Sequence, residues 1–238
     1  MNITPCQIQN YEDFLQTLLS VGFSMGGGND EGIFAAIPWS WNQAPPYETP
    51  IQWHTGDRET DPWEWRIRVL DERRDIAYAK VFFKKSGYIT REWAPYFLAV
   101  RRGGHSFTED YERGTISYDA KRIYECVAEH ETLPLHAMKQ LTGFGDKDSK
   151  SRFDRALTEL QTRMFLTMCG RQQKLSSKGA EYGWSSTVFC TTESFWGEDV
   201  FEEAASIEPT EATESITSRI LTLNPTAEHK KLLKFIHG

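Results

Sequence analysis

Within fourteen residues, the segment from residue 53 to residue 66 gathers carboxylates, indoles and a guanidinium at a density that core packing alone does not require. A carboxylate whose pKa is raised by apolar walls can act as a general base toward water, and an indole can hold a flat ligand by stacking. Asp61 and Glu64 are therefore the candidate catalytic residues. The candidate pocket residues, which together with these two we call the aromatic cluster, are Trp53, His54, Asp57, Trp63, Trp65, Arg66 and Lys80.

A purely structural role explains the same residues equally well. Tryptophan is highly buried on average, and buried charges normally need partners, so the indoles could be core anchors with arginines paired to nearby carboxylates. Trp63 and Trp65 are two residues apart, and on a helix they would point about 200° away from each other. Lys80, with Lys84 and Lys85, flanks an aromatic strand, where solvated edge charges are the simpler interpretation.

The net charge of −7 is divided unevenly along the 238 residues. Residues 1–62 carry −7, residues 63–133 carry +1, residues 134–190 carry +4 and residues 193–238 carry −5. Only the third segment is clearly basic. Because a polyanion responds to the local field, this segment is where a nucleic-acid contact is expected.

Residues 118–192 have the most regular pattern. Helices are predicted over 120–130, 133–141 and 149–164, and strands over 165–169 and 187–191, joined by a polar, basic loop at 171–179. Three helices with tight joints followed by a two-stranded ribbon predict a winged helix. Its candidate nucleic-acid contacts lie opposite the apolar stripe of the third helix and in the loop: Lys150, Ser151, Arg152, Arg155, Thr158, Thr162, Arg171, Lys174 and Lys178.

The other elements complete an α+β fold. Helices are predicted over 11–21, 65–72 and 90–102, and a strand over 75–83, with a turn at Ser86–Gly87; residues 105–117 show no period. In the tail, helices are expected over 199–205 and 210–223, and a last helix is expected to begin at Asn224–Pro225, with its apolar stripe packed on the body. We therefore expect an aromatic-rich α+β region (1–117), a winged helix (118–192) and an acidic helical tail (193–238).

Several classes of protein are not supported by the sequence. No histidine spacing predicts a metal site, no glycine motif predicts a bound cofactor, and the four cysteines are scattered. No apolar run is long enough for a membrane span, and no secretory signal is recognisable. A cytoplasmic protein without metal or cofactor is the expectation.

Four runs of residues resemble the bacterial AlkZ-related proteins. They are Trp53-His-Thr-Gly-Asp57, Asp61-Pro-Trp-Glu-Trp-Arg66, Ala79-Lys-Val-Phe-Phe-Lys-Lys-Ser-Gly87 and Tyr182-Gly-Trp184, and the resemblance covers most of residues 50–200. That family is distantly similar to winged-helix DNA glycosylases, which implies a DNA partner and a connection with repair. Those enzymes use a Gln-x-Gln or Gln-x-Asp motif. Gln7-Ile8-Gln9 matches it, but only six residues precede it, and a surface segment is the favoured interpretation.

The sequence thus predicts a DNA-binding winged-helix protein connected with DNA repair. One alternative is a glycosylase-like enzyme that acts on an alkylated, flipped base at the aromatic cluster. Another is a protein-interaction module, because helix-turn-helix units also serve as docking modules that never meet DNA.

Overall fold

An antiparallel sheet runs through the centre of the computed structural model, which describes residues 7–146, 148–174, 179, 181, 183 and 185–238. Its strand order is β1-β3-β2-β5-β6-β4. The strands are β1 (Phe23–Met25), β2 (Ile76–Phe82), β3 (Lys85–Thr90), β4 (Thr132–Pro134), β5 (Leu166–Gln172) and β6 (Ser186–Thr191). Helices surround this sheet, so the predicted α+β class is confirmed.

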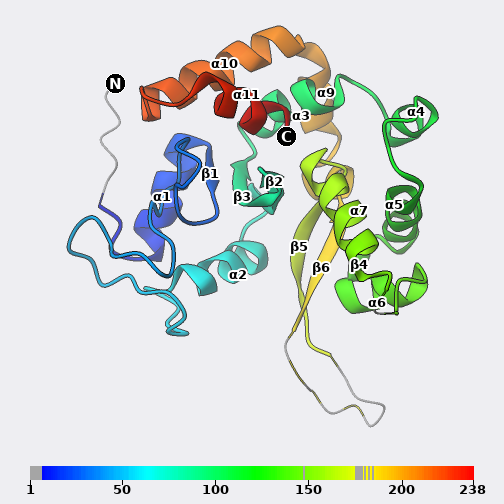
Figure 1. Cartoon of the computed structure of the whole chain (residues 1–238), viewed down its shortest axis with the longest axis horizontal. Helices are drawn as coiled ribbons and strands as arrows, with labels where there is room; N and C mark the ends of the chain where they lie inside the picture. Colours follow the sequence, from blue (N-terminus) through cyan, green and yellow to red (C-terminus); the bar gives the residue numbers. More distant parts are fainter. Residues whose placement is uncertain (1–6, 147, 175–178, 180, 182, 184) are drawn as a thin grey trace.

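Helices lie at both ends of the sheet and along one edge of the molecule (Figure 1). They are α1 (Tyr11–Val21), α2 (Pro62–Glu72), α3 (Ala94–Arg102), α4 (Phe107–Glu112), α5 (Tyr118–His130), α6 (Leu135–Leu141), α7 (Lys150–Thr162), α8 (Thr192–Trp196), α9 (Glu198–Ser206), α10 (Pro209–Leu223) and α11 (His229–His237). Among the described residues, none of these helices has the length and apolar character that a membrane span requires.

The buried side chains form two cores. The first joins α1, α2, α3 and strands β1–β3 to the tail helices, and α11 contributes Leu232, Phe235 and Ile236 to it. The second lies among α4–α7 and strands β4–β6. In the predicted stripe of the last helix, Leu233 is instead 37% exposed, and Phe235 occupies the inward position.

Several predicted element boundaries are wrong, and two of them are set by tertiary contacts. The turn is at Phe83–Lys84, and Ser86 and Gly87 lie inside β3, because Gly87 allows a close approach: a Cβ there would overlap the Phe82 ring. The last helix begins at His229. Asn224 ends α10 and its side-chain amide donates to the carbonyl of Gly32, 2.8 Å away.

Two helices begin where capping chemistry allows. The predicted 65–72 helix starts three residues earlier because Asp61 caps it and Pro62 occupies the first helical turn. In the stretch without a period, Ser106 and Glu109 form a capping box that begins α4.

Arg101, at the C-terminal end of α3, joins three distant elements. Its guanidinium donates to the carbonyls of Val81 (2.7 Å), Thr162 (2.8 Å), Phe235 (2.7 Å) and Ile236 (2.9 Å). Burial lowers the pKa of this guanidinium to about 9, so the group remains charged at neutral pH. The carbonyls at the C-terminal ends of α7 and α11 carry the negative ends of the helix dipoles, which favours a cation at this position. Arg101 therefore fixes α7 and α11 relative to β2.

Candidate functional site

The basic segment forms α7 and the two strands that follow it. Phe153, Leu157 and Leu160 are buried in the second core, and Ser151 and Arg155 lie exposed on the opposite side. This is the distribution that the 3.6-residue period predicts. The exposed side of α7 is therefore available for contact with a ligand at its N-terminal half.

Several of the predicted contact residues are engaged within the protein. Arg152 forms a two-pronged ion pair with Asp119 (2.7 and 3.0 Å), and Arg171 pairs with Asp71 of α2 (3.1 Å). The Thr162 hydroxyl donates to a backbone carbonyl, 3.0 Å away. Such pairs are modest in strength at the surface, but they compete with phosphate for each guanidinium.

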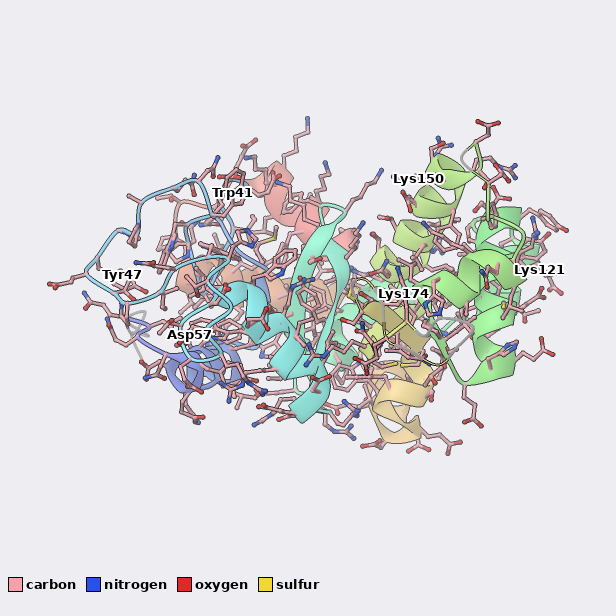
Figure 2. The ribbon with its side chains drawn as sticks, turned by 90° about the horizontal axis from the view of Figure 1, so that it is seen from below. Trp41, Tyr47, Asp57, Lys121, Lys150 and Lys174 are labelled. Atoms are coloured by element: carbon pink, nitrogen blue, oxygen red, sulfur yellow. The ribbon has the colours of Figure 1, made fainter. Side chains whose placement is uncertain are left out.

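The remaining predicted cations are unengaged. The side chains of Lys150, Arg155 and Lys174 have no hydrogen bond or ion pair with any residue that the structure describes. Figure 2 shows Lys150 and Lys174 in the same half of the molecule, whereas Asp57 lies at the opposite end. Lys178 lies outside the described residues.

The C-terminal end of α7 is covered by β2. The backbone N–H of Lys80 donates to the side-chain oxygen of Gln161 (3.0 Å), and the Lys80 carbonyl accepts from the Thr162 hydroxyl. These contacts bring Lys80 to α7. Among the predicted α7 contacts, Thr158 is half-buried and Ser151 is exposed, so accessibility decreases toward the covered end.

In the aromatic cluster, Asp61 caps α2 and holds the preceding loop. Its carboxylate accepts from three backbone N–H groups, those of His54 (3.1 Å), Gly56 (2.9 Å) and Trp63 (2.8 Å). The residue is 0% exposed. A carboxylate held in this way stabilises a helix start and a loop. The geometry therefore favours a structural role for Asp61 over a catalytic one.

The two tryptophans of α2 face opposite sides, as helical spacing requires. Trp65 is 0% exposed and stacks on Phe14 with a centroid separation of 5.1 Å. Trp63 is 42% exposed, with the Arg66 guanidinium 3.4 Å from its ring centroid and the His54 ring at 5.0 Å. The cavity beside Trp65 measures only about 10 Å³, which is room for one water at most. The exposed part of the cluster is thus a stack of His54, Trp63 and Arg66 on the surface.

The other candidates in this region are dispersed. Trp53 packs on the backbone at Gly27, and Asp57 caps a turn by accepting from the backbone N–H groups of residues 59 and 60. The first of these hydrogen bonds is the main reason that the pKa of Asp57 is lowered. Glu64 is half-buried, with no side-chain partner among the described residues.

The Gln-x-Gln motif lies on the surface segment before α1. Gln7 is exposed, and the Gln9 amide donates to the Glu48 carbonyl (3.2 Å). Ile8 is buried between them, and its backbone N–H donates to the hydroxyl of Tyr47. Figure 2 places Tyr47 at the end of the molecule away from Lys150, so this motif and the free end of α7 are far apart.

Sequence reasoning missed a cavity of about 630 Å³ between α3, α4 and α9. Its lining includes the Arg102–Glu193 ion pair (2.8 Å), His105 and Phe201. Burial, with a contribution from Glu193, raises the pKa of the adjacent Tyr124 to about 12. The lining residues come from positions about 90 residues apart and share no spacing pattern, so no local signal could have united them. In the described part of the chain, no group of His, Cys, Asp and Glu is placed to hold a metal ion.

The structure is thus an α+β protein with a surface helix whose N-terminal half carries free cations. A family model described as AlkZ related matches residues 8–237 of the chain. The protein therefore belongs to the AlkZ-related family, and the resemblance seen in its sequence motifs is confirmed.

The fold comparison finds a similar solved structure. It is the Streptomyces sahachiroi DNA glycosylase AlkZ, at 14% sequence identity and a TM-score of 0.40, over 74% of this chain and 50% of that protein. The present chain thus covers half the length of that enzyme. Among curated proteins, no sequence matches this chain.

Proposed function

We propose that the protein binds duplex DNA through the N-terminal half of α7 and the β5–β6 strands. The observation that carries this proposal is the set of unengaged side-chain cations in one basic segment, Lys150 and Arg155 on α7 and Lys174 two residues after β5. Lysine and arginine contacts to phosphates supply most of the affinity of such interfaces. The family is described as related to AlkZ, and the solved structure named AlkZ is a DNA glycosylase. We therefore propose that this protein takes part in DNA repair.

The order of elements supports a winged helix as the binding unit. From α5 the chain runs through β4, α6 and α7 into the antiparallel pair β5 and β6, and β4 pairs with β6. In a winged helix, the last helix of this series enters the major groove and the strand pair reaches the backbone. The proposed contacts are Lys150, Ser151, Arg155, Thr158 and Lys174, with Lys178 as a further proposal from the sequence alone.

Hydrolysis of a glycosidic bond at the aromatic cluster has less support. Asp61 is enclosed and its oxygens are occupied by backbone N–H groups, which leaves Glu64 as the one of the two candidates that solvent reaches. A general base must lie within hydrogen-bond reach of the proton that it removes. The surface stack of Trp63 and Arg66 fits a binding contact better than a reaction centre.

The salt dependence of DNA affinity tests the proposal. If Lys150, Arg155 and Lys174 each contact a phosphate, the logarithm of the binding constant should fall linearly with the logarithm of salt concentration, at about −0.9 per contact. Replacement of Arg155 by Gln should make this slope shallower by about one unit. Fluorescence anisotropy with a labelled duplex of about 20 base pairs measures both quantities.

Arg58→Gln is the matched control, because Arg58 is 64% exposed and adjoins Asp57 at the opposite end of the molecule. Its slope should equal that of the unchanged protein. If the unchanged protein shows no binding at low salt, DNA binding is excluded and the protein-interaction alternative takes its place.

A further inference from the structure

Five lysines gather on a surface outside the predicted binding unit. They lie on the β2–β3 turn and on α11, and we call them the basic surface: Lys84, Lys85, Lys230, Lys231 and Lys234. The average charge of the tail conceals them, because residues 229–237 contain three lysines and no acid, whereas the acids of the tail lie at 193–228. Four of the five lysines are exposed, and Lys231 is half-buried.

The basic surface is a single cluster in space. Glu31 accepts a hydrogen bond from Lys85 (2.8 Å) and lies 3.9 Å from Lys231. The hydrogen bond from Lys85 lowers the pKa of Glu31, and the charges of Lys231 and Lys234 lower it further. Lys234 also sits 5.6 Å from the ring centroid of Phe83. Among the described residues, Glu31 is the one carboxylate that forms an ion pair with any of these five lysines, so positive charge is in excess here.

The same contacts that cover the end of α7 join it to this surface. Lys80, which precedes Lys84 by four residues on the same hairpin, forms backbone hydrogen bonds with side chains at the end of α7. Arg101 binds the carbonyl of Thr162 and those of Phe235 and Ile236 near the end of α11. The C-terminal end of α7 therefore adjoins the β2–β3 hairpin and α11. In Figure 1, α7, β2 and α11 lie next to one another.

The backbone of the β2–β3 turn is unusual for its sequence. Phe83 and Lys84 have φ angles of +52° and +61°, between the paired residues Phe82 and Lys85. Such two-residue turns normally contain Asn and Gly, since side chains disfavour a positive φ. The ring of Phe83 packs near the ring of Phe235, with a centroid separation of 6.1 Å. No packing contact of Lys84 accounts for a lysine at this position, since the residue is exposed.

We infer that the basic surface is a second phosphate-backbone contact, which engages duplex DNA beyond the segment held by α7. This inference rests on the proposed function and extends it to the β2–β3 turn and the C-terminal helix. A cluster of exposed ammonium groups fits the regularly spaced phosphates of a duplex, and a rigid helix and turn hold the charges in place. A DNA that follows α7 to its C-terminal end would reach these lysines next.

Lys84→Gly separates binding from folding. Glycine suits the positive φ, so the melting temperature of the variant should be equal to or above that of the unchanged protein. The affinity for a duplex of about 30 base pairs should nevertheless fall on the order of fivefold to tenfold in 0.1 M salt, and the salt slope should become shallower by about 0.9. Anisotropy and thermal melting of the full chain measure these effects.

The combined variant Lys84→Gly, Lys230→Gln and Lys234→Gln should make the slope shallower by about 2.7, and Arg58→Gln should leave it unchanged. If the combined variant melts normally and keeps the full slope while Arg155→Gln weakens binding, the inference is overturned and the proposed function stands. If only the basic-surface variants weaken binding, this surface carries the contact and the role of α7 is overturned. Absence of DNA binding by the unchanged protein overturns both.

Discussion

Replacement of Trp65 by alanine is expected to lower the free energy of unfolding by about 3–5 kcal/mol. The indole is fully buried and contacts the rings of Phe14 and Tyr11, at centroid distances of 5.1 and 6.2 Å. Its removal leaves a cavity where α1, α2 and the sheet meet, and the two backbone layers cannot collapse without moving a helix. Urea denaturation followed by far-UV circular dichroism measures the loss.

Trp63→Ala is the matched control, two residues away in the same helix. Because Trp63 is 42% exposed and its main partner is the guanidinium of Arg66, the expected cost is about 1 kcal/mol or less. Equal and severe destabilisation by both substitutions would mean that the surface stack is part of the core and would remove it as a candidate contact for a base or another flat ligand.

Helices with a strong apolar period could be predicted closely from the sequence. The first helix matches its predicted bounds, because Phe14, Leu15 and Leu18 form one stripe and Asn10 and Gly22 supply the end signals. The predicted helix over 65–72 begins three residues too far along the chain. Asp61 followed by Pro62 is a start signal that gives the observed first residue. Short helices such as α4 have too few residues to show a period, and only their capping box reveals them.

Glycine and proline were less reliable markers than the stripes. Gly87 indicated a turn, yet its task is to let β3 approach a phenyl ring and the carbonyl oxygen of Ser24, which a Cβ would approach to 2.8 Å. Asn224 with Pro225 indicated a helix start, yet the amide of Asn224 bonds to a loop almost 200 residues earlier. Gly87 and Asn224 are required by contacts with residues far away in the sequence. A local sequence pattern cannot distinguish such a residue from one that ends or begins an element.

The candidate sites, too, could be predicted where they depend on local periodicity and not where they depend on tertiary contacts. Periodicity predicted which side of α7 is exposed, but not that Asp119 would engage Arg152 of α7 or that Asp71 would engage Arg171 of β5. The basic surface was hidden because its lysines come from residues 84–85 and 230–234, and each group was averaged with acidic neighbours. A charge summed over a stretch of sequence describes the electrostatic field at a surface only where that surface is built from the same stretch.

Replacement of Arg101 by methionine should cost about 4 kcal/mol or more of unfolding free energy, comparable to the loss of Trp65. Methionine fills much of the same volume, so the loss measures the hydrogen bonds rather than a cavity. Four carbonyls, three of them in buried hydrogen bonds, would lose a charged donor, and two of the four lie near the end of α11. In the part of the chain that the structure describes, no carboxylate pairs with this guanidinium, so its removal leaves no buried carboxylate without a partner.

Arg101→Lys distinguishes a hydrogen-bonding role from a charge effect. The ammonium has three donors at one point and cannot span four carbonyls on three elements, so we expect this variant to lose roughly half as much stability as the methionine variant. Hydrogen exchange should show the amides of α11 losing protection first, because Arg101 binds the carbonyls of Phe235 and Ile236. A stability loss below about 1 kcal/mol in Arg101→Met, with α11 still protected, would show that apolar packing alone holds the C-terminal helix against α7 and β2.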